Sequence, residues 1–320
     1  MTRAAEVLGF LRGCRGHVSG DFMASRLNIT RTAVWKLLKH LEEIGYTFER
    51  TKGKGYRLIG APDRLYPWEI GRYLETKFVG RTLVYRDSVG STNGLAFELA
   101  LAGCAEGTCV VAETQTAGRG RLRRTWYSPR GKNLYLSCVL RPALHPSQVY
   151  PLTFISSLAV YDTLKTEGLE PRLKWPNDVL IDSRKVSGTL IELSCEADRV
   201  RFVVIGIGLN VNMEEADMHE EIADKATSLL IVSKKPFERA RICGMLLGNL
   251  EHYYEVVRSQ GMGEICRTWE ERARIRGTYM EITQMGTTYR GISEGIDGDG
   301  AILLREKGAV TRVVAGDVVS

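Results

Sequence analysis

The chain has 320 residues, of which 44% are hydrophobic and 26% charged, and its formal net charge is +6. Such a composition is typical of a globular protein and excludes an intrinsically disordered chain. No apolar run approaches the ~18–20 residues that a membrane span requires. The length suits two or three domains of ~100–200 residues. The N-terminus shows no signal-peptide core, so we expect a cytoplasmic protein with no membrane partner.

The positive charge is confined to the start of the chain. Residues 1–60 contain eleven Lys and Arg against five Asp and Glu, whereas residues 61–320 contain 33 of each. This asymmetry predicts a polyanion-binding segment joined to an electrically neutral body. The seven cysteines are scattered singly and the histidines show no ligand spacing, so we expect neither a disulfide framework nor a structural zinc site.

The first sixty residues have the pattern of a winged helix-turn-helix. Helical spacing covers residues 2–12, and Ser19 and Thr30 are N-cap residues for two further helices, the second ending at Gly45. A hairpin over 47–59 would form the wing. We expect DNA contacts from the second helix and the wing, at Thr30, Arg31, Thr32, Trp35, Lys36, Lys52 and Lys54. The alternative is a small helical bundle with a solvated basic face.

The middle of the chain mixes strands and helices. Adjacent strands without intervening helices favour an α+β sheet over a dinucleotide-binding fold of alternating strands and helices. We expect strands at 83–86, 109–113, 133–140, 172–175, 189–193 and 201–211, and helices at 151–167 and 237–257.

Two segments there carry polar chemistry near predicted strand ends. Residues 87–93 are short polar side chains, which fit a ligand or, alternatively, a turn followed by a helix N-cap. Residues 115–124 place four arginines within six residues, among glycines. An anionic ligand would order such a loop through the forked donors of arginine, although a solvated basic loop is the alternative. The loop is not a P-loop, because no Gly-Lys-Ser or Gly-Lys-Thr follows its glycines.

Two further segments lie later in the chain. Residues 174–178 and 184–188 place lysines beside apolar strands, where a point charge suits phosphoryl or acyl transfer; the alternative is a pair of hairpin turns. Residues 206–212 partly match a dinucleotide fingerprint but lack its third glycine. A strand whose glycines let a ligand lie against bare backbone fits this segment better.

Taken in order, these segments resemble the biotin protein ligases, in their repressor-bearing form. The resemblance rests on SVGSTN at 88–93, QTAGRGR at 115–121, KWPNDV at 174–179, RKVSG at 184–188 and GIGLNVN at 206–212, together with the N-terminal pattern. It implies three domains: a winged helix-turn-helix at 1–62, an α+β catalytic domain at 66–272, and a C-terminal SH3-like β domain at 273–320. Predicted short strands at 278–283, 289–295, 301–305 and 310–314 suit the last of these.

The resemblance also implies roles for individual residues. Lys185 and Arg121 would be catalytic, and Asp178 would help to hold Mg²⁺. Nucleotide contacts would come from Arg121, Trp126, Asn177, Lys185 and Asn210. Biotin contacts would come from Ser91, Thr92, Asn93, Gln115, Gly118, Arg119, Gly120, Arg121, Lys185 and Gly188.

The implied activity uses ATP, biotin and Mg²⁺. It forms biotinyl-5′-AMP and then transfers biotin to a lysine in the carrier domain of acetyl-CoA carboxylase. The implied regulation is repression at operator DNA, with biotinyl-5′-AMP as corepressor and a ligand-linked homodimer. Two alternatives stay open: a repressor that senses biotin or its adenylate without transferring it, and a lipoate-type ligase.

One departure from the family pattern falls within the arginine loop. The family loop reads GRGRRGR, whereas here Leu122 replaces an arginine and Arg123 replaces the last glycine. Because glycine is the most flexible residue, we expect this end of the loop to be less flexible than in the family.

Overall fold

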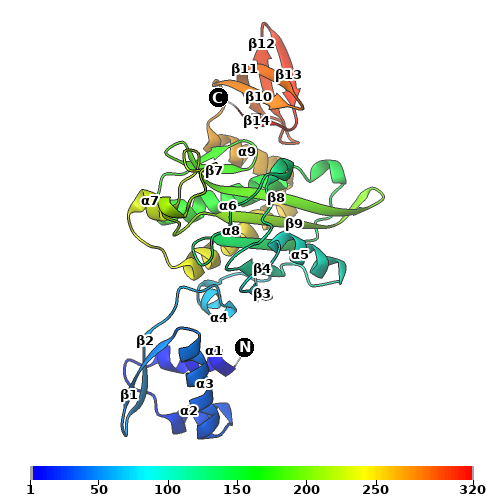
Figure 1. Cartoon of the computed structure of the whole chain (residues 1–320). Coiled ribbons are helices and arrows are strands. Elements are labelled where there is room, and N and C mark those ends of the chain that lie inside the picture. The colour runs from blue at the N-terminus through cyan, green and yellow to red at the C-terminus, as the bar shows by residue number, and fades with distance from the viewer. Residues whose placement is uncertain (1–2, 319–320) are drawn as a thin grey trace. The chain divides into compact units, whose positions relative to one another are not determined.

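The computed structural model describes residues 3–318 and divides into two compact units, Met1–Arg64 and Leu65–Ser320 (Figure 1). The N-terminal unit consists of three helices and a hairpin. Its elements are α1 (Arg3–Gly13), α2 (Gly20–Leu27), α3 (Arg31–Glu43), β1 (Thr47–Thr51) and β2 (Gly55–Gly60).

The two predicted helix caps are confirmed. Ser19 Oγ accepts a hydrogen bond from Phe22 N at 3.1 Å, and Thr30 Oγ1 accepts one from Ala33 N at 3.2 Å. Each hydroxyl satisfies an amide that the first helical turn leaves without a backbone partner. The starts of α2 and α3 are therefore fixed by side-chain caps.

The wing is tied to the helices by a close backbone approach. Val18 and Tyr56 exchange two backbone hydrogen bonds of 2.8 and 2.9 Å. Gly55 has φ +111°, and a Cβ there would lie 2.2 Å from the Val18 carbonyl oxygen. Only glycine fits this position, because any side chain would collide with the neighbouring backbone.

The second unit is built on a seven-stranded sheet of order β3-β4-β5-β9-β8-β7-β6. Only β3 and β4 are parallel, and every other pair is antiparallel. This pattern confirms the predicted α+β class. The strands are β3 (Leu83–Arg86), β4 (Cys109–Ala112), β5 (Leu134–Leu140), β6 (Arg172–Lys174), β7 (Asp178–Ile181), β8 (Arg184–Glu196) and β9 (Arg199–Leu209).

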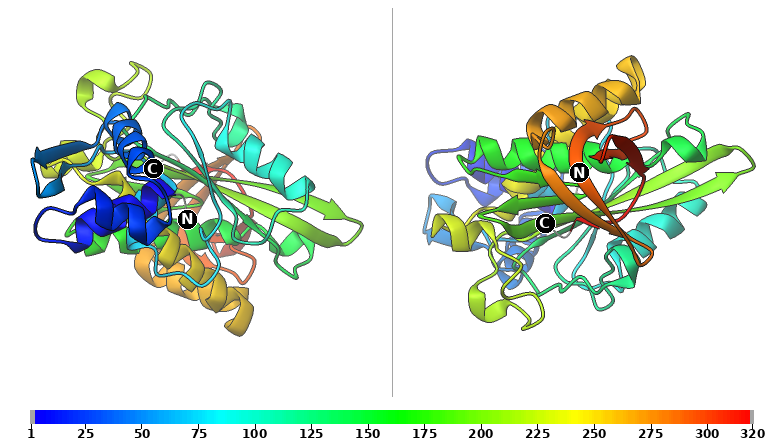
Figure 2. Two further views of the ribbon diagram at one scale, coloured as in Figure 1. Left: turned by 90° about the horizontal axis from the view of Figure 1, so that it is seen from below. Right: turned by 90° about the horizontal axis from the view of Figure 1, so that it is seen from above.

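Helices cover both faces of this sheet (Figure 2). They are α4 (Pro67–Ile70), α5 (Thr92–Leu101), α6 (Leu152–Thr166), α7 (Leu229–Ser233), α8 (Arg239–Gln260) and α9 (Met262–Ala273), with short 3₁₀ turns at Gly71–Tyr73, Arg121–Arg123, Pro146–Gln148 and Glu215–Asp217. The sequence analysis did not predict α9, although Ile265, Cys266 and Trp269 recur at helical spacing and are buried.

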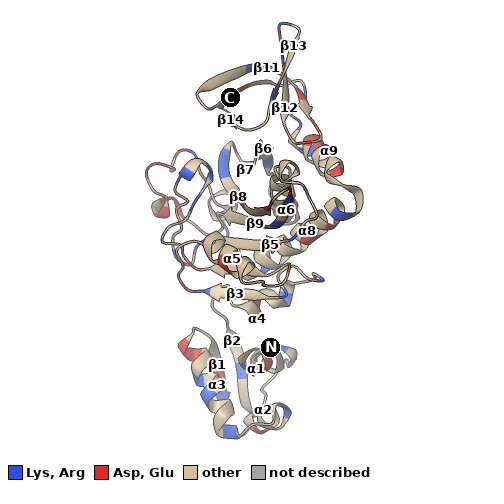
Figure 3. Ribbon diagram, turned by 90° about the vertical axis from the view of Figure 1, so that its right-hand side faces the viewer, with Lys and Arg blue, Asp and Glu red and all other residues tan. Residues whose placement is uncertain are grey.

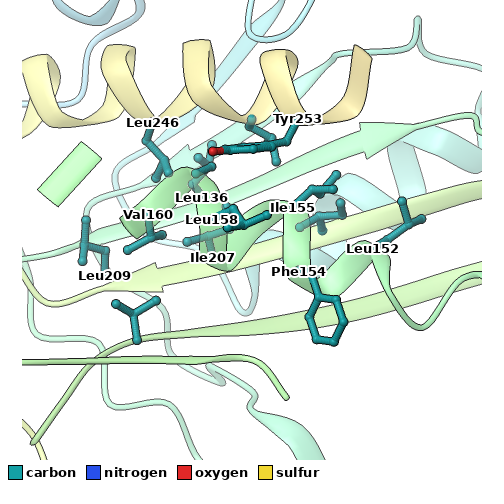
Figure 4. Close-up of a cluster of buried hydrophobic side chains, with 14 of the residues drawn as sticks. Leu136, Leu152, Phe154, Ile155, Leu158, Val160, Ile207, Leu209, Leu246 and Tyr253 are labelled. Atoms are coloured by element: carbon teal, nitrogen blue, oxygen red, sulfur yellow. The ribbon is translucent and has the colours of Figure 1, made fainter. Parts of the chain in front are cut away.

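Side chains alternate between the two faces along the central strands. On β9, Ile205 and Ile207 enter the main core beneath α6 and α8, part of which is shown in Figure 4. Phe202 and Val204 enter a smaller cluster packed on α5. Gly206 lies on the same face of β9 as Phe202 and Val204. Gly206 carries no side chain, so the Asn93 amide lies directly against the backbone there; a Cβ on Gly206 would be 2.1 Å from Asn93 Oδ1.

The C-terminal part of the second unit is a five-stranded antiparallel sheet of order β13-β12-β11-β10-β14. It joins the larger sheet through Trp175, whose Nε1 donates to the Gly300 carbonyl at 3.0 Å. The strands are β10 (Tyr279–Gln284), β11 (Thr287–Ile296), β12 (Ile302–Glu306), β13 (Ala309–Val313) and β14 (Asp317–Val318). Within residues 3–318, no helix combines the length and apolarity that a bilayer crossing would need.

Candidate active site

A cleft of about 970 Å³ lies over the glycines of β8 and β9. It brings together all five sequence segments, which are spread over more than a hundred positions. Of the predicted site residues of this unit, those that line the cleft are Ser91, Thr92, Asn93, Gln115, Arg119, Gly120, Arg121, Trp126, Asn177, Asp178, Lys185, Gly188 and Asn210. Gly118 is buried behind the wall, where a Cβ would lie 2.4 Å from the Trp126 carbonyl oxygen.

One end of the cleft is lined by neutral polar groups. Gln115 Oε1 accepts from Thr92 N at 2.8 Å and from Thr92 Oγ1 at 3.1 Å, and Gln115 Nε2 donates to Ser128 Oγ at 3.1 Å. These bonds hold the side-chain amide in one orientation. This end of the cleft suits a neutral ligand that both donates and accepts hydrogen bonds.

Asn93 lies beneath these groups and is only 4% exposed. Its Oδ1 accepts from Ser137 Oγ at 2.6 Å, and its Nδ2 donates to the Leu190 carbonyl at 3.3 Å and to Glu192 Oε2 at 2.9 Å. Since protein groups already use its amide, Asn93 is placed to orient its neighbours. Ser137 was not among the predicted site residues, although a serine within the apolar strand LYLSCVL is a recognisable signal.

The floor of the cleft is formed by the glycine backbone of β8 and β9, and the Trp126 ring lies against it. A Cβ on Gly208 would lie 2.3 Å from Trp126 Cε2, and one on Gly188 would lie 3.1 Å from Trp126 Cζ3. Trp126 Nε1 is buried and has no hydrogen-bond partner among the described residues. The ring is therefore an aromatic surface inside the cleft that a planar ligand can stack on.

The predicted lysine and its acidic neighbour are in direct contact. Lys185 Nζ lies 2.6 Å from Asp178 Oδ1, and 5.5 Å from the centroid of the Trp126 ring. Asp178 begins β7 and pairs in register with Gly188 of β8. The two hairpin turns that the sequence offered as the alternative to a binding site are present. They place this ion pair in the cleft.

Asn177 and Asn210 are nearly buried, at 6% and 4% exposure. Asn177 Nδ2 donates to the Thr189 carbonyl at 2.6 Å, and its Oδ1 accepts from Arg121 Nη1 at 2.9 Å. Asn210 Nδ2 donates to the Thr227 carbonyl at 3.0 Å. Both amides are thus held rigidly by the sheet, and Asn177 positions an arginine.

The arginine loop, residues 118–126, forms a small hairpin. Gly120 N donates to the Arg124 carbonyl at 2.8 Å, and Trp126 N to the Gly118 carbonyl at 3.0 Å. At its tip, Leu122 and Arg123 have φ of 53° and 59°. Left-handed backbone is strained for residues other than glycine. Arg123 therefore adopts the conformation that the family's glycine would adopt without strain.

Three arginines of this loop are anchored to other elements. Arg119 pairs with Glu192 of β8 at 3.1 Å, Arg124 pairs with Asp317 of β14 at 2.5 Å, and Arg121 donates to the Gly316 carbonyl at 3.4 Å. No acidic side chain of residues 3–318 lies within ion-pair distance of Arg123. Within the described residues Arg121 also has no ion pair, because its partners are the Asn177 amide and the Gly316 carbonyl. Arg121 and Arg123 are therefore the loop arginines with uncompensated charge.

The opposite wall comes from a segment that the sequence analysis did not single out. Glu221, Asp224 and Lys225 line the cleft. Tyr127 donates to Glu221 Oε2 at 2.5 Å, and its ring stacks on His219 with the centroids 4.2 Å apart. Hydrogen bonding to Glu221 raises the pKa of Tyr127. Its hydroxyl is therefore held as a donor. No cluster of three or more metal-ligating side chains occurs among residues 3–318.

The predicted DNA-contacting residues lie on α3, at its N-cap and in the wing, and the Lys and Arg positions of this unit are blue on the ribbon in Figure 3. Arg31, Thr32, Trp35 and Lys36 of α3 are exposed, as are Lys52 and Lys54 in the β1–β2 turn. Trp35 is 44% exposed, and Lys39 lies over its ring at 5.5 Å. Thr30 serves as the α3 cap. This surface is cationic and presents a helix, as a major-groove reader does.

Comparisons with known proteins agree with both units. Residues 85–210 match the biotin/lipoate A/B protein ligase family, and residues 3–57 match a helix-turn-helix domain. The bifunctional ligase/repressor BirA of Bacillus spizizenii is 38% identical over 94% of this chain and 93% of its own. The BirA of Escherichia coli is 28% identical over 94% and 92%.

A solved structure of a biotin protein ligase is similar to most of this chain. Biotin protein ligase from Aquifex aeolicus, in complex with biotin and ATP, matches with a TM-score of 0.64 and 28% identity, covering 74% of this chain and 97% of that one. The sequence resemblance is thereby confirmed. The chain belongs to the biotin protein ligase family, in the group of bifunctional ligase/repressors that carry an N-terminal helix-turn-helix domain.

Proposed function

We propose that this protein activates biotin with ATP and transfers it to a specific lysine of a biotin carboxyl carrier domain. The observation that carries the proposal is the convergence of five separate segments on one cleft, with neutral polar groups at one end and Arg121, Arg123 and Lys185 elsewhere on its walls. Biotin has a neutral ureido ring and a carboxylate, and ATP brings an adenine and a triphosphate. The cleft offers groups that match each of these parts.

The ureido ring would lie against Ser91, Thr92 and Gln115, and the Gln115 amide is already held in one orientation. Gly188, Gly120 and Arg119 would complete the biotin site, because the glycines let the ligand approach the backbone closely. Gly118 would act from behind the wall by allowing the close approach of the Trp126 backbone. Asn93 would act by orienting Thr92 and its neighbours through its buried amide.

The nucleotide would use the aromatic and cationic groups. Trp126 would stack on the adenine, while Asn177 and Asn210 would lie near the phosphates. Mg²⁺ is usually held by one or two carboxylates together with substrate phosphates, and Asp178 is a cleft-lining carboxylate of that kind. Asp178 would exchange its contact with Lys185 for the cation when nucleotide binds.

In the first step the biotin carboxylate attacks the α-phosphorus, and the bond from that phosphorus to pyrophosphate breaks. Lys185 and Arg121 would hold the carboxylate and α-phosphate together and stabilise the charge of the transition state. In the second step the acceptor lysine amine attacks the acyl carbon of biotinyl-5′-AMP. AMP leaves, and the amine loses its proton. No covalent enzyme intermediate is required.

The same chain would repress transcription at operator DNA. Its α3 and wing carry the exposed cations, and biotinyl-5′-AMP would be the corepressor that favours a homodimer able to bind two half-sites. The arginine loop would be the element whose position depends on the ligand.

The deciding test is biotin-dependent exchange of pyrophosphate into ATP, with lipoate as the parallel substrate. Exchange with biotin alone is expected. Exchange with lipoate alone would identify a lipoate-type ligase. Biotin binding without exchange would identify a sensor that does not activate biotin, and the catalytic assignments would then be wrong.

A further inference from the structure

Glu192 contacts Arg119 and Asn93, which line the cleft, and neither the sequence motifs nor the catalytic scheme assigns it a role. It follows Gly188 and Leu190 on the same face of β8, and both of those residues line the cleft. Its side chain is 27% exposed, so the carboxylate is partly shielded from solvent. A carboxylate there must be held by partners.

Two predicted biotin-binding residues supply those partners. Arg119 Nη2 lies 3.1 Å from Glu192 Oε1, and Asn93 Nδ2 donates to Glu192 Oε2 at 2.9 Å. Arg119 belongs to the arginine loop, whereas Asn93 lies in the first turn of α5 and is buried. Glu192 therefore joins the loop to a rigid part of the core.

The same network continues to the neutral end of the cleft. Ser137 Oγ lies 2.6 Å from Asn93 Oδ1 and 2.8 Å from Thr92 Oγ1, and Thr92 in turn contacts Gln115. Ser137 has one proton, and Asn93 Oδ1 can only accept, so Ser137 donates to Asn93. The hydroxyl of Thr92 is then the donor that can serve either Ser137 or Gln115.

These contacts close a ring. Gln115 and Arg119 are four positions apart in the chain, and they are also connected through Thr92, Ser137, Asn93 and Glu192 on α5, β5 and β8. An exposed ion pair alone contributes little. Here the carboxylate is fixed by a buried amide before the arginine reaches it, so less freedom is lost when the pair forms.

We propose that Glu192 and Ser137 are positioning residues that link the site of the ureido ring to Arg119, so that bound biotin holds the arginine loop in place for the nucleotide. This inference rests on the proposed function and adds residues to it. Neither residue is expected to touch the reacting atoms.

The experiment uses the full-length chain with Glu192→Gln and Ser137→Ala, and with Glu196→Gln as the matched control. Glu196 lies on the same strand and pairs with Arg201 at 3.7 Å, whereas Glu192 contacts Arg119 and Asn93. Calorimetry without nucleotide gives the biotin Kd, and pyrophosphate exchange gives KM and kcat. We expect Glu192→Gln to weaken biotin binding about tenfold and to raise the KM for ATP, with kcat within about twofold.

A double-variant cycle separates positioning from general damage. Because Arg119 and Glu192 act as a unit, Arg119→Ala combined with Glu192→Gln should weaken biotin binding no more than Arg119→Ala alone. Ser137→Ala should weaken biotin binding in the same direction. Because Ser137 is buried, its unfolding midpoint should fall by a few degrees while the protein stays folded at the assay temperature.

Additive effects in the cycle, or a Glu192→Gln variant that binds like Glu196→Gln, would overturn the inference while leaving the ligase activity in place. A fall in the unfolding midpoint that accounts for the lost binding would overturn it as well. Absence of biotin-dependent exchange in the unmodified protein would instead remove the proposed function, and this inference with it.

Discussion

Lys185 Nζ lies 2.6 Å from Asp178 Oδ1 across the neighbouring strands β8 and β7, on the wall of the cleft. The lysine charge is therefore compensated by a protein carboxylate that a ligand can displace. A substrate carboxylate and a phosphate together would offer Lys185 more negative charge than Asp178 does. This competition places the two residues at the centre of the first reaction step.

Lys185→Ala should lower the rate of pyrophosphate exchange by at least about 10²–10³-fold, because a preorganised cation would be lost from the transition state. Lys185 is 33% exposed, so the unfolding midpoint should not change. Lys165→Ala, at a solvent-exposed pair with Glu170, is the control. Full exchange activity in the Lys185 variant would refute the role given to it.

Asp178→Asn tests the proposed Mg²⁺ contact. An amide keeps the shape but loses the charge, so the KM for MgATP should rise about tenfold, which corresponds to about 1.4 kcal/mol. The biotin Kd should stay near its original value. Exchange measured over a range of Mg²⁺ concentrations gives the result, with Asp182→Asn in the β7–β8 turn as the control. An unchanged Mg²⁺ dependence would leave Asp178 as a partner of Lys185 alone.

Substitutions at Arg123 test whether its charge, or the loss of the glycine that the family has at this position, distinguishes this loop. If its uncompensated charge contacts the triphosphate, Arg123→Gly and Arg123→Asn should both raise the KM for ATP several-fold, since both residues tolerate positive φ. Arg123→Lys should retain most of the affinity. A change in the glycine variant alone would show that backbone freedom, and not charge, distinguishes this loop.

The pair of Glu113 and Arg239 is fully buried, with 0% exposure of both side chains and 2.9 Å between Glu113 Oε2 and Arg239 Nη2. Removing one partner leaves a buried charge without compensation. Arg239→Met should therefore lower the free energy of unfolding by about 3–5 kcal/mol, measured by urea denaturation. Adding Glu113→Gln should recover part of the loss, and a further loss of similar size would contradict this explanation.

Substitutions at Lys52 and Lys54 test whether the wing contacts DNA phosphates. With a random-sequence duplex of 30 base pairs as the probe, changing both to alanine should weaken binding and reduce the slope of log K against log salt by about two. Fluorescence anisotropy across salt concentrations measures this slope. An unchanged slope would remove the wing from the phosphate contacts.

Much of the fold followed from local patterns. Ser19 and Thr30 cap helices as predicted, because an N-cap depends on a hydroxyl and the next three amides. Predicted and observed strands differ mainly at their ends: β8 extends over Arg184–Glu196 where 189–193 was expected, because pairing with β9 and β7 continues the ladder beyond the apolar run. Strand β7 was not predicted, because four residues are too few to show the alternation of apolar and polar residues that marks a strand.

The sequence by itself determined the chemical groups of the candidate site and the order in which they occur. Its motifs supply Gln115, the loop arginines, Lys185 and the glycines of β9, and the charge excess marks the DNA-binding unit. Only the tertiary structure decided that Lys185 pairs with Asp178, that Trp126 covers Gly208, and that Ser137 and Glu192 join the network. These contacts join residues far apart in the chain, and strand pairing and packing bring them together, which no local pattern encodes.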